Sequence, residues 1–85
     1  MYQIRLLDAA VRELAKLDKP VAQRIGKRLH WLAENFELIK PLPLTGNFTE
    51  LYKLRVGDYR VIYEVIPAEN VLIIHLIGHR RDVYR

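Results

Sequence analysis

The stretch "LYKLRVGDYRVIYEV", residues 51–65, predicts a β-hairpin around which the rest of the fold can be built. Apolar and polar side chains alternate on both sides of Gly57-Asp58, and a glycine in first position suits a two-residue turn. A turn of this length fixes the register of the two strands, residues 51–56 and 59–66. The resulting cross-strand pairs are Val56 with Tyr59, Arg55 with Arg60, and Lys53 with Ile62.

This register gives the hairpin two faces of different chemistry. The first face is apolar and should pack under helices; it carries Tyr52, Leu54, Val56, Tyr59, Val61 and Tyr63. The second face carries three cations, Lys53, Arg55 and Arg60. Like charges directly opposite each other destabilise a sheet, so stability alone does not explain the Arg55–Arg60 pair. We interpret the second face as an anion-binding surface; the alternative is a solvated sheet face.

A third strand, residues 71–77, is predicted after the four-residue connection "PAEN". Its alternation should add Leu72, Ile74 and Leu76 to the apolar face. His75 should then fall beside Ile62 on the basic face, where we interpret it as a surface or packing residue.

The N-terminal half predicts one strand and two helices. Residues 2–7 can form a strand, Asp8 is a candidate N-cap, and the first helix should end near Asp18. Pro20 suits the first turn of the second helix. Apolar residues at helical spacing are Val11, Leu14 and Leu17 in the first helix and Val21, Ile25, Leu29, Leu32 and Phe36 in the second. Residues 37–50 contain two prolines and a glycine and predict a loop.

The element order is β-α-α-β-β-β, which predicts an α+β fold. We expect a two-layer sandwich in which an antiparallel sheet carries a helical hairpin on one face. With 85 residues, 51% hydrophobic and 28% charged, the chain has the composition of a globular protein and room for one domain, residues 1–85. No apolar run approaches the ~18–20 residues needed to cross a bilayer, and the N-terminus lacks the apolar core of a secretory signal. We therefore expect a cytoplasmic protein with no membrane association.

The composition also narrows the possible chemistry. The absence of cysteine excludes disulfides, thiolate nucleophiles and the common zinc sites. We expect no metal and no cofactor, because Asp58, Glu64 and Asp82 do not form an evident carboxylate cage. A net charge of +4 suggests an anionic partner, with nucleic acid as the leading candidate; an acidic protein partner and a simple solubility bias are the alternatives.

The last eight residues, "GHRRDVYR", supply a second group of cations directly after the third strand. A strand ending at Gly78 would deliver His79 and Arg80 to the sheet edge near Arg60; the alternative is a frayed basic tail. The combined candidate set is Lys53, Arg55, Arg60, His79, Arg80, Arg81 and Tyr84. Cations of this kind stabilise charge that develops on phosphoryl oxygens, while a titratable group moves the protons. Without a thiol or a carboxylate pair, the remaining phosphoryl chemistry is attack by the 2′-OH of an RNA.

The segment "PLTGNFTELYKLRVGDYRVIYEV", followed by an apolar strand and "IGHRRDVY", resembles the RelE branch of the RelE/ParE toxin superfamily. The resemblance covers essentially the whole chain and is strongest over residues 44–84. It implies the toxin of a type II toxin–antitoxin pair that cleaves messenger RNA in the ribosomal A site, without metal, by 2′-OH attack. The partners that it implies are a RelB-like antitoxin, the ribosome and messenger RNA.

Carried over by position, the resemblance assigns functional roles to Lys53, Arg55, Arg60, Arg80 and Tyr84. Arg55 departs from the family, which has a lysine there; an arginine can hold a phosphate but does not serve as a base near neutral pH. We expect Tyr84 or Lys53 to take the proton from the 2′-OH. Arg60 and Arg80 should stabilise the phosphorane-like charge, with Arg80 or His79 near the leaving 5′-oxygen.

Other residues and other functions stay open on the sequence alone. Arg24, Lys27 and Arg28 in the second helix could, with Arg81, grip ribosomal RNA phosphates; the alternative is a solvated helix face. His30 and Trp31 are interpreted as packing or partner-facing residues. One competing function is a ParE-like inhibitor of DNA gyrase on the same fold, which would not need the whole catalytic set. The other is an inactive homologue that binds an antitoxin and represses its own operon.

Overall fold

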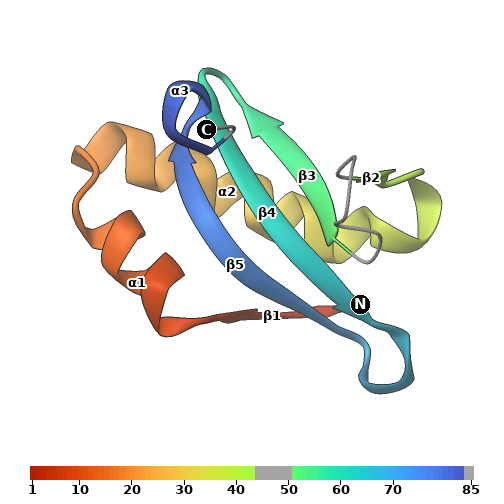
Figure 1. Cartoon of the computed structure of the whole chain (residues 1–85). Coiled ribbons are helices and arrows are strands. Elements are labelled where there is room, and N and C mark those ends of the chain that lie inside the picture. The colour runs from red at the N-terminus through yellow and green to blue at the C-terminus, as the bar shows by residue number, and fades with distance from the viewer. Residues whose placement is uncertain (44–50, 84–85) are drawn as a thin grey trace.

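The structure, a computed structural model, describes residues 1–43 and 51–83 of the chain. Its elements are β1 (Gln3–Leu6), α1 (Asp8–Ala15), α2 (Lys19–Asn35), the 3₁₀ helix η1 (Phe36–Leu38), β2 (Leu42–Pro43), β3 (Leu51–Val56), β4 (Tyr59–Ile66), the 3₁₀ helix η2 (Pro67–Glu69), β5 (Val71–His79) and α3 (Arg80–Val83). The described strands form one sheet in the order β1-β5-β4-β3-β2. In Figure 1, α2 crosses behind β3, β4 and β5, while α1 lies beside β1 and β5.

The sheet is mixed, because β1 pairs in parallel with β5 whereas the other neighbouring strands are antiparallel. Alternation in residues 2–7 predicts which side chains face the core, and Tyr2, Ile4 and Leu6 do so. Alternation carries no information about the direction of a strand or its neighbour. The expected α+β class is therefore confirmed, and the expected antiparallel pairing is wrong at β1.

The β3–β4 hairpin has the predicted strand bounds and register. Val56 lies opposite Tyr59, and Lys53 lies opposite Ile62. Gly57 begins the turn with a φ of 60°, a left-handed conformation that glycine adopts without steric cost. The turn therefore holds the strands in the register that separates the apolar face from the basic one.

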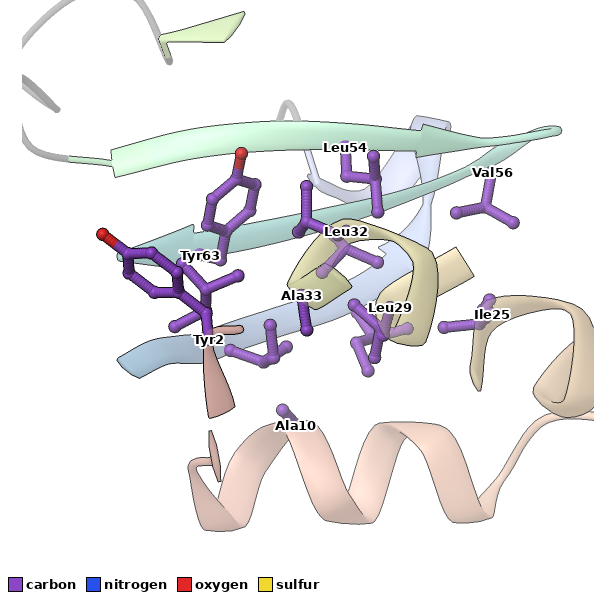
Figure 2. Packing of buried hydrophobic residues seen from close by; sticks show 13 residues of the cluster. Tyr2, Ala10, Ile25, Leu29, Leu32, Ala33, Leu54, Val56 and Tyr63 are labelled. Atoms are coloured by element: carbon purple, nitrogen blue, oxygen red, sulfur yellow. The ribbon is translucent and has the colours of Figure 1, made fainter. Parts of the chain in front are cut away.

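A hydrophobic core fills the space between the helices and one face of the sheet (Figure 2). Helix α2 contributes Ile25, Leu29 and Leu32, and α1 contributes Ala10. The sheet contributes the predicted apolar face: Leu54, Val56, Val61, Tyr63, Leu72 and Ile74 are buried. Because side chains from both helices meet this one face, the predicted two-layer arrangement is confirmed.

The helix boundaries match the prediction at α2 and differ at α1. Pro20 lies in the first turn of α2, as predicted. At α1 the N-cap is Leu7, and Asp8 is the first helical residue, so the expected side-chain cap is absent. Helix α1 ends at Ala15, three residues before Asp18, because the chain turns there toward α2.

The apolar stripe predicted for the first helix differs at one position: Ala10 faces the core in place of Val11, while Leu14 and Leu17 pack against the core as predicted. Ala10 is fully buried, whereas Val11 is 50% exposed. Ala10 and Leu14 have the i, i+4 spacing of one helix face, and Leu17 packs against the core after the helix has ended at Ala15.

A β-bulge in β5 moves the end of this strand out of the predicted alternation. Tyr63 pairs with Ile74, but the preceding residue of β4 pairs with Leu76, so His75 is the extra residue. Leu76 is consequently 42% exposed on the basic face, and Ile77 is 1% exposed in the core. The prediction that Leu76 joins the apolar face is wrong for this reason.

The predicted loop over residues 37–50 contains short ordered elements. Besides η1, strand β2 pairs Leu42 with Lys53 at the edge of β3. A two-residue strand that includes a proline has too few residues to show alternation, so the loop prediction is wrong there. Residues 44–50 lie outside the described residues. None of the helices in the described ranges combines the length and the apolar character that a membrane crossing requires.

Candidate functional site

The basic face of the hairpin carries the three cations that the sequence predicts. Lys53, Arg55 and Arg60 lie on the side of β3 and β4 opposite the helices. Arg55 is exposed and directly faces Arg60 across the ladder, while Lys53 is half-buried and faces Ile62. Three positive side chains in two cross-strand pairs form a surface that attracts an anion.

Arg60 is held by the turn that precedes it. Its Nη1 donates hydrogen bonds to the carbonyl oxygens of Gly57 and Tyr59, both at 3.0 Å. These carbonyls carry partial negative charge, so they offset part of the repulsion between Arg60 and Arg55. The turn therefore orients one cation of the site and makes the like-charged pair tolerable.

Helix α3 brings the C-terminal cations to the same turn. The backbone N–H of Arg80 donates to the carbonyl oxygen of Asp58 at 2.8 Å, and α3 lies beside the β3–β4 turn in Figure 1. Because Arg60 binds the carbonyl of Gly57, the backbone of Arg80 and the guanidinium of Arg60 converge on the two residues of one turn. Arg81 is exposed one residue further along α3. Tyr84 lies outside the described residues.

His79 is separated from the basic face. The bulge places His79 opposite Tyr59 and Gly78 opposite Arg60. The rings of His79 and Tyr59 meet edge to face with centroids 5.5 Å apart, and Tyr59 packs against the core. His79 Nδ1 accepts a hydrogen bond from the backbone N–H of Arg81 at 3.2 Å. Among the candidates, the structure therefore places the backbone of Arg80 at the turn that also binds Arg60, and it places the imidazole of His79 on the helix side.

The basic face also holds a hydrogen-bonded pair that sequence reasoning missed. His75 Nε2 lies 2.9 Å from Glu64 Oε1, and the two side chains are 32% and 30% exposed. Simple alternation places His75 beside Ile62, and the bulge moves it toward Glu64 instead. The sequence signal was a histidine and a glutamate on the same face of neighbouring strands. Within the described ranges no further His, Asp or Glu joins them in an arrangement that could hold a metal ion.

Aromatic side chains pack at one end of the core. The ring centroids of Tyr63 lie 5.8 Å from Tyr52 and 6.3 Å from Phe36, and Phe36 lies 4.9 Å from Tyr2. Burial, with a smaller contribution from Tyr52, raises the pKa of Tyr63 to about 12. Tyr63 therefore stays neutral at physiological pH and has a structural role.

The predicted basic residues of α2 lie along a groove beside β3. Arg24, Lys27 and Arg28 line it together with Arg55. The guanidinium carbon of Arg28 lies 4.0 Å from the centroid of the Trp31 ring. The α2 cations and the basic face of the hairpin therefore meet at Arg55.

Comparison with known proteins identifies related sequences. The family model described as "ParE toxin of type II toxin-antitoxin system, parDE" matches residues 4–84. A "Putative RelE-like toxin protein" of Escherichia coli is 30% identical over an alignment of 87 residues, gaps included; the alignment covers 98% of this chain and 90% of the relative. "Toxin RelG" of Mycobacterium tuberculosis is 25% identical over 84 residues, which cover 99% of this chain and 97% of the relative.

Solved structures share the fold. The toxin–antitoxin complex RelBE2 of Mycobacterium tuberculosis contains a chain with a TM-score of 0.83 at 24% identity, covering 93% of this chain and 98% of that one. The isolated RelE toxin of Escherichia coli has a TM-score of 0.79 at 26% identity, covering 93% of this chain and 84% of that one. The mixed sheet with two helices on one face is therefore an arrangement that these toxins share.

Proposed function

We propose that this chain acts as an endoribonuclease of the RelE type. The premise is that the chain belongs to the ParE toxin family of type II toxin–antitoxin systems. It cleaves messenger RNA on the ribosome without a metal ion and thereby inhibits translation. The relative with 30% identity carries the name of a RelE-like toxin, which supports the RelE side of the superfamily.

The observation that carries this proposal is the cation cluster of the basic face beside α3. Lys53, Arg55 and Arg60 share one surface, and the backbone of Arg80 is fixed to the adjoining turn. In the proposed reaction the 2′-oxygen attacks the neighbouring phosphorus and the bond to the 5′-oxygen breaks. The products are a 2′,3′-cyclic phosphate and a 5′-hydroxyl. A base takes the 2′-OH proton, and an acid returns a proton to the 5′-oxygen.

We assign roles to Arg60, Arg80 and Lys53 in this reaction. Arg60 and Arg80 stabilise the negative charge that builds on the phosphoryl oxygens; removing one such donor costs enzymes about 10²–10³ in rate. Lys53 or Tyr84 accepts the 2′-OH proton. Arg80 lies near the leaving oxygen in preference to His79, because His79 packs on Tyr59.

An antitoxin is the second partner in this proposal. The archaeal RelE–RelB complex from Pyrococcus horikoshii contains a chain that is 27% identical to this one, with a TM-score of 0.70. We infer that this chain binds a RelB-like antitoxin, of which an amphipathic helix could lie across the sheet or displace α3.

Inhibition of DNA gyrase is the other candidate function, and the name of the matching family model, ParE, favours it. A gyrase inhibitor would not need a cluster that combines Lys53, Arg60 and Arg80. The RNA-cleaving function accounts for these residues, so we rank it first.

A cell-free translation reaction distinguishes the two functions. The wild-type protein is added, messenger RNA ends are mapped, and the reaction is repeated without ribosomes and with Arg80→Ala; Arg12→Ala, on exposed α1, is the charge-matched control. We expect ribosome-dependent cleavage by the wild type and the control only. Intact messages together with inhibition in a gyrase supercoiling assay would contradict the proposal.

A further inference from the structure

A groove lies between α2 and β3, and Arg55 of the basic face is part of its lining. Its volume is about 400 Å³. Cations from two elements line it: Arg24, Lys27 and Arg28 come from α2, and Arg55 comes from β3. The remaining described residues that line it are Trp31, Val56 and Gly57. We call this groove, as defined by these seven residues, the basic groove.

The charge of the basic groove is uncompensated within the described chain. Its described lining contains no acidic residue. The ion pairs found in residues 1–43 and 51–83 are His30–Glu34 and His75–Glu64, and neither lies in the groove. Arg24 Nη1 also lies close to the hairpin turn, since a Cβ on Gly57 would be 3.5 Å from it. Four cations gathered in this way repel one another, and a bound polyanion would remove that repulsion.

Trp31 adds a flat aromatic surface to these cations. Its side chain is 38% exposed, although it is the largest apolar side chain of α2. The guanidinium carbon of Arg28 lies over the ring, 4.0 Å from its centroid, which is a cation–π contact. An aromatic ring flanked by arginines is the arrangement that stacks nucleobases while the arginines bind phosphates. An acidic peptide would use the cations but would have no need for the indole.

The basic groove is continuous with the candidate site. An adjoining cavity of about 240 Å³ shares Arg28, Trp31 and Arg55 with it and adds Lys53 to the lining. In the described residues β2 covers the edge of β3 only at Tyr52 and Lys53, so the edge beyond them carries no paired strand. A nucleic acid strand can therefore pass from the basic face, around Arg55, to Trp31.

We propose that the basic groove binds single-stranded RNA next to the phosphodiester that is cleaved, with phosphates on Arg24 and Lys27 and a base stacked on Trp31. This inference rests on the proposed function, because the strand is the flank of the same substrate. The groove holds RNA independently of sequence, since its contacts are charge and stacking.

Trp31 makes the inference directly measurable, because it is the one tryptophan of the 85-residue chain. A 2′-O-methyl RNA of about ten nucleotides, which cannot undergo 2′-OH attack, is titrated into the protein while tryptophan fluorescence is recorded. We expect quenching that saturates and that weakens with salt, with a slope of ~0.7 for each phosphate contact. Absence of quenching by this RNA would overturn the inference.

Two sets of variants test whether the RNA binds in the groove. Their affinities are measured from the fluorescence anisotropy of a labelled RNA. The double variant Arg24→Ala, Lys27→Ala should bind the RNA at least about tenfold more weakly than the wild type. The control is Lys16→Ala, Lys19→Ala, which removes the same charge from exposed positions outside the groove. This control should bind as the wild type does. Trp31→Ala should also lose about tenfold, and Trp31→Phe should retain most of the affinity. Equal binding by the two double variants would overturn the inference.

The same variants separate this inference from the proposed function. If the groove double variant binds RNA normally while Arg80→Ala abolishes message cleavage, the groove assignment fails and the proposed function stands. If RNA binding depends on the groove but the wild type cleaves no message, the proposed function fails and the groove still binds RNA. An acidic peptide of equal charge that displaces the RNA equally well would make the occupant a protein and would overturn the assignment to RNA.

Discussion

Arg55 and Arg60 face each other directly across the β3–β4 ladder, and the guanidinium of Arg60 bonds to the carbonyl oxygens of the turn. The turn thus holds a pair of like charges that the sheet alone would disfavour. We interpret this arrangement as follows: repulsion between the two arginines lowers the stability of the fold, and the same two arginines together bind an anion.

Replacing Arg55 should raise the stability of the fold and lower the RNA-cleaving activity. Arg55→Thr removes the repulsion and places a β-branched residue in a strand, so we expect the free energy of unfolding to rise by roughly 0.5 kcal/mol. Messenger RNA cleavage should fall at the same time. Urea unfolding measures the first effect, with Arg5→Thr on exposed β1 as the control. A loss of stability in Arg55→Thr would contradict the interpretation.

Replacing Arg60 should affect activity far more than folding. Arg60→Ala loses two partly exposed hydrogen bonds to the turn, which contribute about 1 kcal/mol to stability. Cleavage should fall by about 10²–10³, because a donor to the phosphoryl oxygens is lost. Single-turnover cleavage and urea unfolding are measured on the same sample. An Arg60→Ala protein with full activity would remove Arg60 from the site.

The bulge in β5 predicts that alanine substitution at two neighbouring positions lowers the free energy of unfolding by different amounts. Ile77→Ala should lower the free energy of unfolding by about 2–4 kcal/mol, because Ile77 is 1% exposed in the core. Leu76→Ala should cost less than about 1 kcal/mol, because Leu76 is 42% exposed. Strict alternation predicts the opposite order. Denaturant unfolding of both variants decides between the two registers.

The raised pKa of Tyr63 predicts a loss of stability in alkali. Below pH 10 the phenol is neutral in the folded and the unfolded chain, so the raised pKa has no effect. Between pH 10 and about 12 the unfolded chain loses the proton first, and the unfolding free energy should fall by about 2–3 kcal/mol in total. Tyr63→Phe should lack this part of the decrease. Equal pH dependence of the wild type and Tyr63→Phe would contradict the raised pKa.

The sequence predicted the hairpin to the residue because a two-residue turn leaves one register for its strands. It did not predict the bulge, because "VLIIHLI" is apolar almost throughout and gives no polar marker of which side chain faces the core. The direction of β1 and the burial of Ala10 in place of Val11 depend on tertiary packing, which alternation and helical spacing do not specify.

For the site as well, the positions of the residues within the hairpin were predicted correctly, and the positions that depend on tertiary structure were not. Lys53, Arg55 and Arg60 could be placed on one face because they lie within the hairpin, whose register was determined by local sequence. His75 lies in the bulge and His79 beyond it, so strict alternation did not place them beside Glu64 and Tyr59. The groove at Trp31 depends on how α2 crosses β3, which is a tertiary feature.

The central claim is cleavage by the 2′-OH of the RNA on a metal-free cation cluster. Its most direct test is a message with a single 2′-deoxynucleotide on the 5′ side of a mapped cleavage site, translated in the presence of the protein. We predict that this site stays intact, whereas the all-ribose message is cut to a 2′,3′-cyclic phosphate and a 5′-hydroxyl. Cleavage of the deoxy-substituted message at the same site would contradict the account.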